Sequence, residues 1–219
     1  MSRSLSYIFP AAKDDDVCLL QDGLADVALE LNGNLSNSIN SEVSFLQHGY
    51  SRSISIASVN DLSFIEFTIT GIQNGVLVTE DVTGPNNDIV FSDEVFDVIL
   101  SIVPDNNAND ILIGTGPTGF FPMINIDLER DVYRWSFVIQ ATVSGENIPT
   151  TVFSAVKNII NNGLTYDDNR ESLIELKALS SEDLYYQEDK NELYRSILIE
   201  IEGDNATLGH ELTLNFIQM

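Results

Sequence analysis

The chain has 219 residues, 43% of them hydrophobic, and its 34 acidic and 10 basic side chains give a formal net charge of −24. A chain of this length can bury a core as one β domain or as two small ones. So acidic a protein is not expected to bind nucleic acid, because such binding needs Lys and Arg side chains to neutralise phosphates. For the same reason it is not expected to bind an anionic membrane. The charge instead favours solubility, counter-ions or a basic protein partner.

The single cysteine and the N-terminal residues limit the protein class further. One cysteine, Cys18, excludes an internal disulfide and a cysteine-based zinc site within one chain. It lies in an apolar stretch, which predicts a buried thiol that packs as a small hydrophobe. The N-terminal residues lack the apolar core of a signal peptide, and no run reaches the length of a membrane span. We therefore expect a soluble protein made in a cytoplasm.

The chain begins with a polar segment, residues 1–16, which contains Pro10 and ends in Lys13-Asp14-Asp15-Asp16. Such a segment is typical of an N-terminal arm, either disordered by itself or ordered by a neighbouring subunit, and both states stay open. From residue 17 onward the pattern changes to strands and turns. We predict a first β half at 17–116 and a second at 117–219.

Short apolar or alternating runs, separated by turn residues, predict antiparallel strands in the first half. The predicted strands are 24–31, 43–46, 51–58, 62–70, 76–82, 88–91 and 95–103. The first ends at the turn Asn32-Gly33-Asn34, and the last stops at Pro104. Residues 105–110 are predicted to form an Asn-rich turn.

The dipeptide Asn74-Gly75 allows the register of one hairpin to be predicted. It favours a two-residue type I′ turn, because both positions need positive φ. With that turn three pairs face each other: Phe67 and Val82, Ile69 and Glu80, Gly71 and Val78. Side chains at alternate positions share a face, so Glu80 is placed among apolar residues.

A carboxylate on an apolar face is unfavourable unless it is paired or hydrogen-bonded. We therefore predict a partner for Glu80 and name Arg52, on the preceding strand, as the other half of a structural ion pair. Two alternatives stay open. A β-bulge would turn Glu80 outward, or the side chain would belong to a functional site.

A glycine-rich segment, 114–119, is predicted to carry the chain into the second half as a linker. Beyond it a period-two run at 132–144, with Tyr133, Trp135 and Phe137 on one face, predicts a strand. Further runs predict a strand at 150–156, a strand or short helix at 172–179, an exposed loop at 180–191, and a closing hairpin from 194–202 and 206–217. The chain is predicted to be all-β, with antiparallel sandwich-type sheets, as two similar halves or as one compact domain.

Catalysis requires a positioned acid, base or nucleophile, and no known arrangement of this kind is found in the sequence. His48 and His210 each lie beside a glycine at a predicted turn, without metal-ligand spacing. The segment 114–119 lacks the Lys and helix start of a phosphate-binding loop, and Pro117 removes an N–H donor. We predict no enzyme and no catalytic or cofactor-binding residues.

Calcium is the one cofactor that the sequence raises. Three oxygen-rich segments, 14–16, 105–110 and 167–169, are of the kind that binds this ion, but none matches the EF-hand pattern. Plain turns are the prediction for all three, so no metal ligand is assigned.

The motifs follow one another in an order that can be compared with known families. They are the runs 29–33, 52–56, 67–71, 74–75, 79–80, 83–86, 96–99, 113–116, 137–145 and 212–218. In this order the chain resembles a group of uncharacterised structural proteins of tailed bacteriophages, most closely from Arg52 to Gly116. Two features depart from the group: segment 166–191 is longer and more acidic, and Asp81 stands where an apolar residue or Thr is expected.

The resemblance implies a virion component made in the host cytoplasm, and transfers no catalytic residues. We expect a protein that decorates or cements the outside of the capsid through non-covalent contacts with the major capsid protein and with copies of itself, as a homo-oligomer. A tail, baseplate or head–tail connector component is the alternative. From another class, a receptor- or glycan-binding β module would expose Trp135 or the pair Tyr185-Tyr186.

Overall fold

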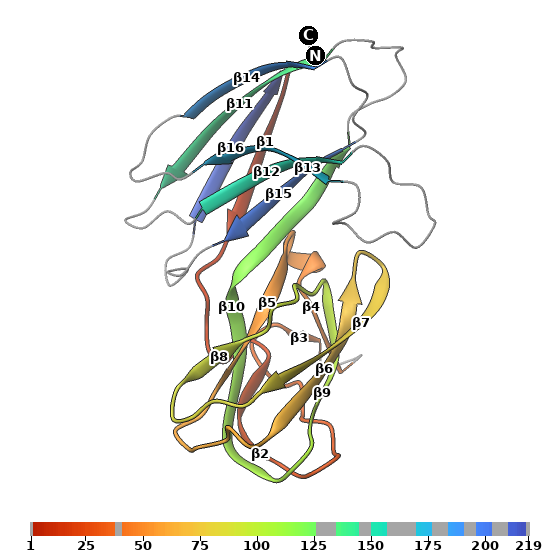
Figure 1. The fold of residues 1–219 in the computed structure, drawn as a ribbon, viewed down its shortest axis with the longest axis vertical. Coiled ribbons are helices and arrows are strands. Elements are labelled where there is room, and N and C mark those ends of the chain that lie inside the picture. The colour runs from red at the N-terminus through yellow and green to blue at the C-terminus, as the bar shows by residue number, and fades with distance from the viewer. Residues whose placement is uncertain are drawn as a thin grey trace. The chain divides into compact units, whose positions relative to one another are not determined.

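A computed structural model describes the backbone of residues 2–37, 41–125, 135–144, 150–156, 170–176, 184–190, 196–202 and 210–217, and the side chains of residues 10–37 and 41–120. The chain divides into two compact units (Figure 1), each described here by itself: unit 1 is Met1–Ala11 with Phe120–Met219, and unit 2 is Ala12–Gly119. The predicted all-β class is confirmed, because every described element is a strand except the 3-10 turn η1 (Leu46–His48).

Unit 2 is built from two sheets whose registered pairs are antiparallel. The first has the order β3-β4-β9-β6-β7, and in the second β5 lies between β8 and β10, with β2 also paired to β10. The bounds are β2 (Cys18–Gly23), β3 (Ser36–Asn37), β4 (Glu42–Ser44), β5 (Ser51–Ala57), β6 (Glu66–Gln73), β7 (Val76–Thr83), β8 (Ile89–Phe91), β9 (Val98–Pro104) and β10 (Ala108–Asn125).

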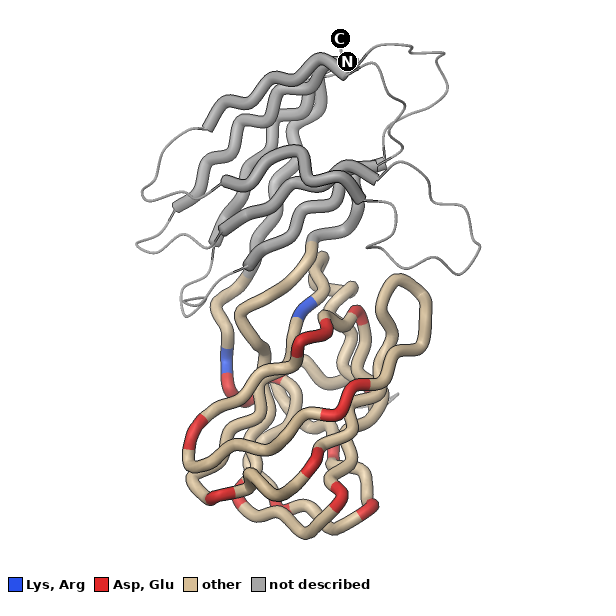
Figure 2. The backbone as a smooth tube through the Cα atoms, viewed as in Figure 1, with Lys and Arg blue, Asp and Glu red and all other residues tan. Residues whose placement is uncertain are grey.

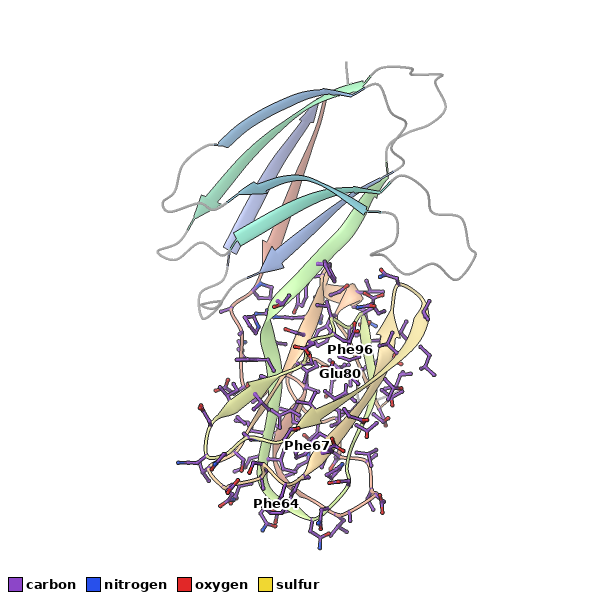
Figure 3. All side chains as sticks on the ribbon, in the orientation of Figure 1. Phe64, Phe67, Glu80 and Phe96 are labelled. Atoms are coloured by element: carbon purple, nitrogen blue, oxygen red, sulfur yellow. The ribbon has the colours of Figure 1, made fainter. Side chains whose placement is uncertain are left out.

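The core of unit 2 takes apolar side chains from both sheets. Phe67 and Ile69 on β6 are fully buried, as are Ile54 and Ile56 on β5. Figure 3 shows Phe67 inside the unit, together with Phe96 from the loop before β9. β5 is buried on both of its faces, from Ser51 to Ile56. Its polar residues are therefore inside the protein and need partners there.

The predicted hairpin register is confirmed for β6 and β7, with Phe67 opposite Val82, Ile69 opposite Glu80 and Gly71 opposite Val78. The turn has the expected geometry, since φ is 55° at Asn74 and 77° at Gly75.

Replacing Asn74 by alanine is expected to lower the free energy of unfolding by about 1 kcal/mol, because alanine disfavours the left-handed region that Asn tolerates. Glycine at position 74 adopts this conformation readily, so Asn74→Gly is the matched control. Urea unfolding of both variants measures the difference. Equal losses in the two would show that the side chain, not the backbone conformation, is what matters at this position.

Unit 1 also contains two sheets, with the orders β1-β16-β11-β14 and β13-β12-β15-β10. The bounds are β1 (Ser2–Phe9), β11 (Trp135–Ser144), β12 (Thr150–Val156), β13 (Arg170–Leu176), β14 (Leu184–Lys190), β15 (Ser196–Glu202) and β16 (His210–Ile217). The chain enters this unit for the second time within β10, between Gly119 and Phe120.

The N-terminal segment differs from the predicted arm at 1–16. Ser2–Phe9 forms β1, which pairs with β16 from Ser2 opposite Ile217 to Phe9 opposite His210. Pairing with β16 satisfies the backbone N–H and C=O groups on one edge of the segment, so the segment is ordered within its own chain. Residues 1–11 thus belong to unit 1, and residues 12–16 to unit 2.

Four further elements differ from prediction. The segment 114–119 lies within β10 and is not a linker, and the predicted loop at 180–191 contains β14. The last two strands do not form a hairpin, because β15 pairs with β12 whereas β16 pairs with β1 and β11. Residues 24–31 form no regular strand, although Leu29 N–H bonds to the Ile102 carbonyl of β9.

Candidate functional site

Unit 2 contains a fully buried arginine between two of its strands. Arg52 lies on β5 and is 0% exposed. Its Nε donates to the Gly116 carbonyl of β10 at 2.7 Å. Burial lowers the pKa of Arg52 to about 10, and the neighbouring Tyr50 and Asp16 oppose this shift. The guanidinium therefore ties β5 to β10 inside the unit.

Tyr50 and Asp16 complete this buried cluster. The Tyr50 ring lies 6.0 Å from the Arg52 guanidinium carbon, within range of a cation–π contact. The Tyr50 ring also neighbours Phe45, with the two centroids 6.0 Å apart, and His48, with the two centroids 6.2 Å apart. Asp16 is 5% exposed, and its Oδ1 accepts no hydrogen bond from a described residue. Burial raises the pKa of both Tyr50 and Asp16.

Glu80 has a different partner from the one predicted. Its Oε1 accepts from the Asp93 N–H at 2.7 Å and its Oε2 from the Glu94 N–H at 3.1 Å. Arg52 instead bonds to Gly116 and lies beside Tyr50 and Asp16, so the structure replaces the expected ion pair by two separate arrangements. Figure 3 labels the half-buried Glu80 side chain. Backbone N–H groups from the loop after β8 satisfy its carboxylate, as a cation would have done.

Glu80→Gln is expected to change how stability depends on pH. Burial raises the pKa of Glu80 above its ordinary value of 4.5. At pH values just above 4.5 the folded chain still holds this proton, whereas the unfolded chain has released it. The free energy of unfolding that this group contributes therefore decreases as the pH rises through that window. The wild-type chain should lose stability relative to Glu80→Gln across that window, as measured by urea unfolding at several pH values. Glu66→Gln removes an exposed carboxylate as the control, and an identical pH profile for wild type and Glu80→Gln would contradict the prediction.

A second buried carboxylate, which the sequence did not single out, supports the hairpin turn. Asp97 is 5% exposed and accepts hydrogen bonds from the Ser51 hydroxyl and, at 2.6 Å, from the Asn74 N–H. It therefore connects the start of β5 to the β6–β7 turn. A lone Asp inside the apolar run 95–103 is the signal that could have identified it.

The glycine-rich segment of β10 is explained by a close backbone approach. Thr115 N–H donates to the Lys13 carbonyl at 2.8 Å, and Lys13 N–H donates to the Thr115 hydroxyl at 3.0 Å. A Cβ on Gly114 would lie 1.9 Å from the Lys13 carbonyl oxygen. Glycine is needed here because two chain segments meet.

The surface of unit 2 is predominantly acidic. Residues 12–119 contain seventeen acidic side chains and two basic ones, a formal charge of −15. Arg52 is buried, so Lys13 is the exposed basic side chain of the described part of this unit. Figure 2 shows acidic positions spread over the whole unit. Such a surface repels polyanions and attracts basic partners.

The two oxygen-rich segments that the structure describes, 14–16 and 105–110, show no assembled ligand set. Among the residues whose side chains are described, no group of three or more His, Cys, Asp or Glu side chains is arranged to hold a metal ion. This covers 14–16 and 105–110, whereas 167–169 lie outside the described residues. The described helical residues include no span long and apolar enough for a membrane crossing.

The remaining predicted residues divide between confirmed and undescribed ones. Cys18 is fully buried, as expected, and burial raises the pKa of its thiol to about 12. His48 is exposed at the end of η1. His210 begins β16, but its side chain lies outside those described, as do the side chains of Trp135, Tyr185 and Tyr186.

The described polar side chains therefore join strands to one another: Arg52 joins β5 to β10, Asp97 joins β5 to a turn, and Glu80 joins β7 to the loop after β8. The acidic surface of unit 2 is one feature that it offers to other molecules. Comparison with protein-family models, with curated proteins and with solved structures found no match for this chain.

Proposed function

We propose that this chain is a structural protein of a phage virion, which decorates or cements the outside of the capsid through non-covalent contacts with the major capsid protein and with copies of itself. The observation that carries the proposal is the acidic surface of unit 2, with its formal charge of −15. Such a surface is repelled by packaged DNA, and it is suited to a basic protein surface. The sequence resemblance from Arg52 to Gly116 supplies the virion context.

The buried polar contacts of unit 2 support a structural role. Arg52 and Asp97 each hold parts of the unit together, and neither is exposed to solvent. Many copies that each bury a modest area can stabilise a shell together. Contacts between copies then use surfaces other than unit 2, because two such acidic surfaces repel each other.

Quantitative mass spectrometry of purified particles tests this proposal, with the major capsid protein as the internal reference. A copy number comparable to that of the major capsid protein supports decoration or cementing. A few copies per particle would move the chain to the tail, baseplate or head–tail connector, and its absence from particles would contradict the virion assignment. A wash at high ionic strength adds a second readout, because screening should release a protein held by charge.

A further inference from the structure

β7 is an edge strand that is hydrogen-bonded to another strand on one side only. It is the last strand in the order β3-β4-β9-β6-β7, and it runs for eight residues, Val76–Thr83 (Figure 1). An edge of this length presents unpaired backbone groups, which are a template for another strand.

The register shows which backbone groups of β7 face outward. In a two-residue hairpin the pair beside the turn, here Gln73 and Val76, is hydrogen-bonded, and bonded pairs then alternate along the ladder. The even-numbered residues of β6 bond on its other side, since the carbonyls of Ile72 and Glu66 accept from Asp97 and Asp105. The outward N–H and C=O groups of β7 are therefore those of Leu77, Thr79, Asp81 and Thr83.

These four residues are open to solvent. Thr79, Asp81 and Thr83 are exposed, and Leu77 is 65% exposed. No hydrogen bond from the described part of the chain occupies their outward backbone groups. Their side chains share the face of the sheet opposite the core, where Thr68 on β6 bonds to Asp81 at 2.7 Å.

We propose that the edge of β7 binds an extended, basic segment of a partner protein, which adds a strand to the sheet. Main-chain hydrogen bonds supply affinity in this mode, and alternate side chains supply specificity. The segment would place an apolar side chain against Leu77 and a Lys or Arg against Asp81, four residues further along. This inference goes beyond the proposed function, because it holds for any protein partner.

Charge decides between a partner and a second copy of this chain. Glu80 and Asp81 lie in the middle of β7, and Glu80 is bonded to the backbone of Asp93 and Glu94, two further acidic residues. Pairing of β7 with β7 of another copy would bring these groups together, in units that each carry −15. Acidic side chains on an edge strand thus oppose self-pairing and favour a basic strand.

The test uses a fluorescein-labelled peptide of sequence Lys-Lys-Thr-Val-Thr-Leu-Thr, in which the second Lys and the Leu lie four residues apart on one face, and the full chain, with binding followed by fluorescence anisotropy. The matched control peptide has the same side chains and charge, but its alternate amides are N-methylated and cannot donate. We expect the first peptide to bind, and the N-methylated one to bind about tenfold more weakly or not at all. Equal binding of the two would reduce the contact to charge attraction and overturn the proposal, as would no binding of either.

Protein variants locate the contact on β7. Thr79→Pro removes one outward N–H, which an edge strand tolerates, and should weaken binding about tenfold. Thr79→Ala keeps that N–H and should bind as the wild type does. Asp81→Lys should weaken binding, with a smaller dependence on salt. Unchanged binding by Thr79→Pro would place the peptide elsewhere.

Two further outcomes bear on the occupant and on the proposed function. Sedimentation velocity of the wild-type chain should show no association that Thr79→Pro abolishes, and such an association would assign the edge to a second copy. If Thr79→Pro fails to fold, the comparison of the two peptides on the wild-type chain still decides. Particle stoichiometry uses neither peptide, so the two proposals can fail separately.

Discussion

Arg52→Ala is expected to lower the free energy of unfolding by about 3–5 kcal/mol. The side chain is fully buried, its Nε bonds to the Gly116 carbonyl, and its guanidinium lies beside Tyr50 and Asp16. Truncation leaves a cavity, removes one hydrogen bond from the Gly116 carbonyl, and takes one positive charge away from the buried Asp16 carboxyl group. Each of these three consequences destabilises the folded state.

Urea unfolding of the full chain, followed by circular dichroism, measures this loss. Lys13→Ala is the matched control, because it also removes one positive charge from unit 2 but from an exposed side chain. Exposed charges contribute little, so this control should lose less than about 1 kcal/mol. Equal losses in the two variants would mean that net charge, and not the buried contacts of Arg52, determines the effect.

Gly114→Ala is expected to lower the free energy of unfolding by about 3 kcal/mol, which is the upper end of the range for overpacked sites. The added Cβ would lie 1.9 Å from the Lys13 carbonyl oxygen and 2.5 Å from the Asp14 backbone. Backbone atoms cannot move aside by changing a rotamer. The segment at 13–14 would therefore shift away from β10, and the Lys13–Thr115 hydrogen bonds would be lost.

The control for this variant is a glycine in open space. Gly49 has φ of 83° and no atom within 4 Å of an added Cβ. Gly49→Asn introduces a residue that tolerates this conformation, so we expect only a small decrease in stability, measured by thermal unfolding. A Gly114→Ala protein as stable as Gly49→Asn would show that residues 13–14 do not pack on β10.

The β6–β7 hairpin was predictable because its information is local. Asn74 and Gly75 select the turn, the turn sets the register, and the register places Glu80 on the core side of β7. The need for a partner at Glu80 followed from the same reasoning. Which partner it has did not follow, because a loop N–H and a guanidinium both satisfy a carboxylate. The approach of residues 93–94 is a property of the folded chain.

The N-terminal strand shows the opposite case. Residues 4–9 alternate Ser with larger side chains before an Ile-Phe pair, a weak strand signal that the polar segment around it obscured. The partner of β1 is β16, at the far end of the chain. No local pattern specifies a pairing between segments so distant, because any open strand edge provides the same backbone groups.

By itself, the sequence determined the all-β class, the β6–β7 register and the acidic surface, since turn chemistry, alternation and net charge depend on neighbouring residues or on composition alone. Only the tertiary structure decided three things: that residues 114–119 continue a strand, that Arg52 bonds to Gly116, and that β7 lies at an open edge. Each of these depends on which distant segments meet. That choice is made by the packing of the whole core, where many long-range contacts form together and no single motif is sufficient.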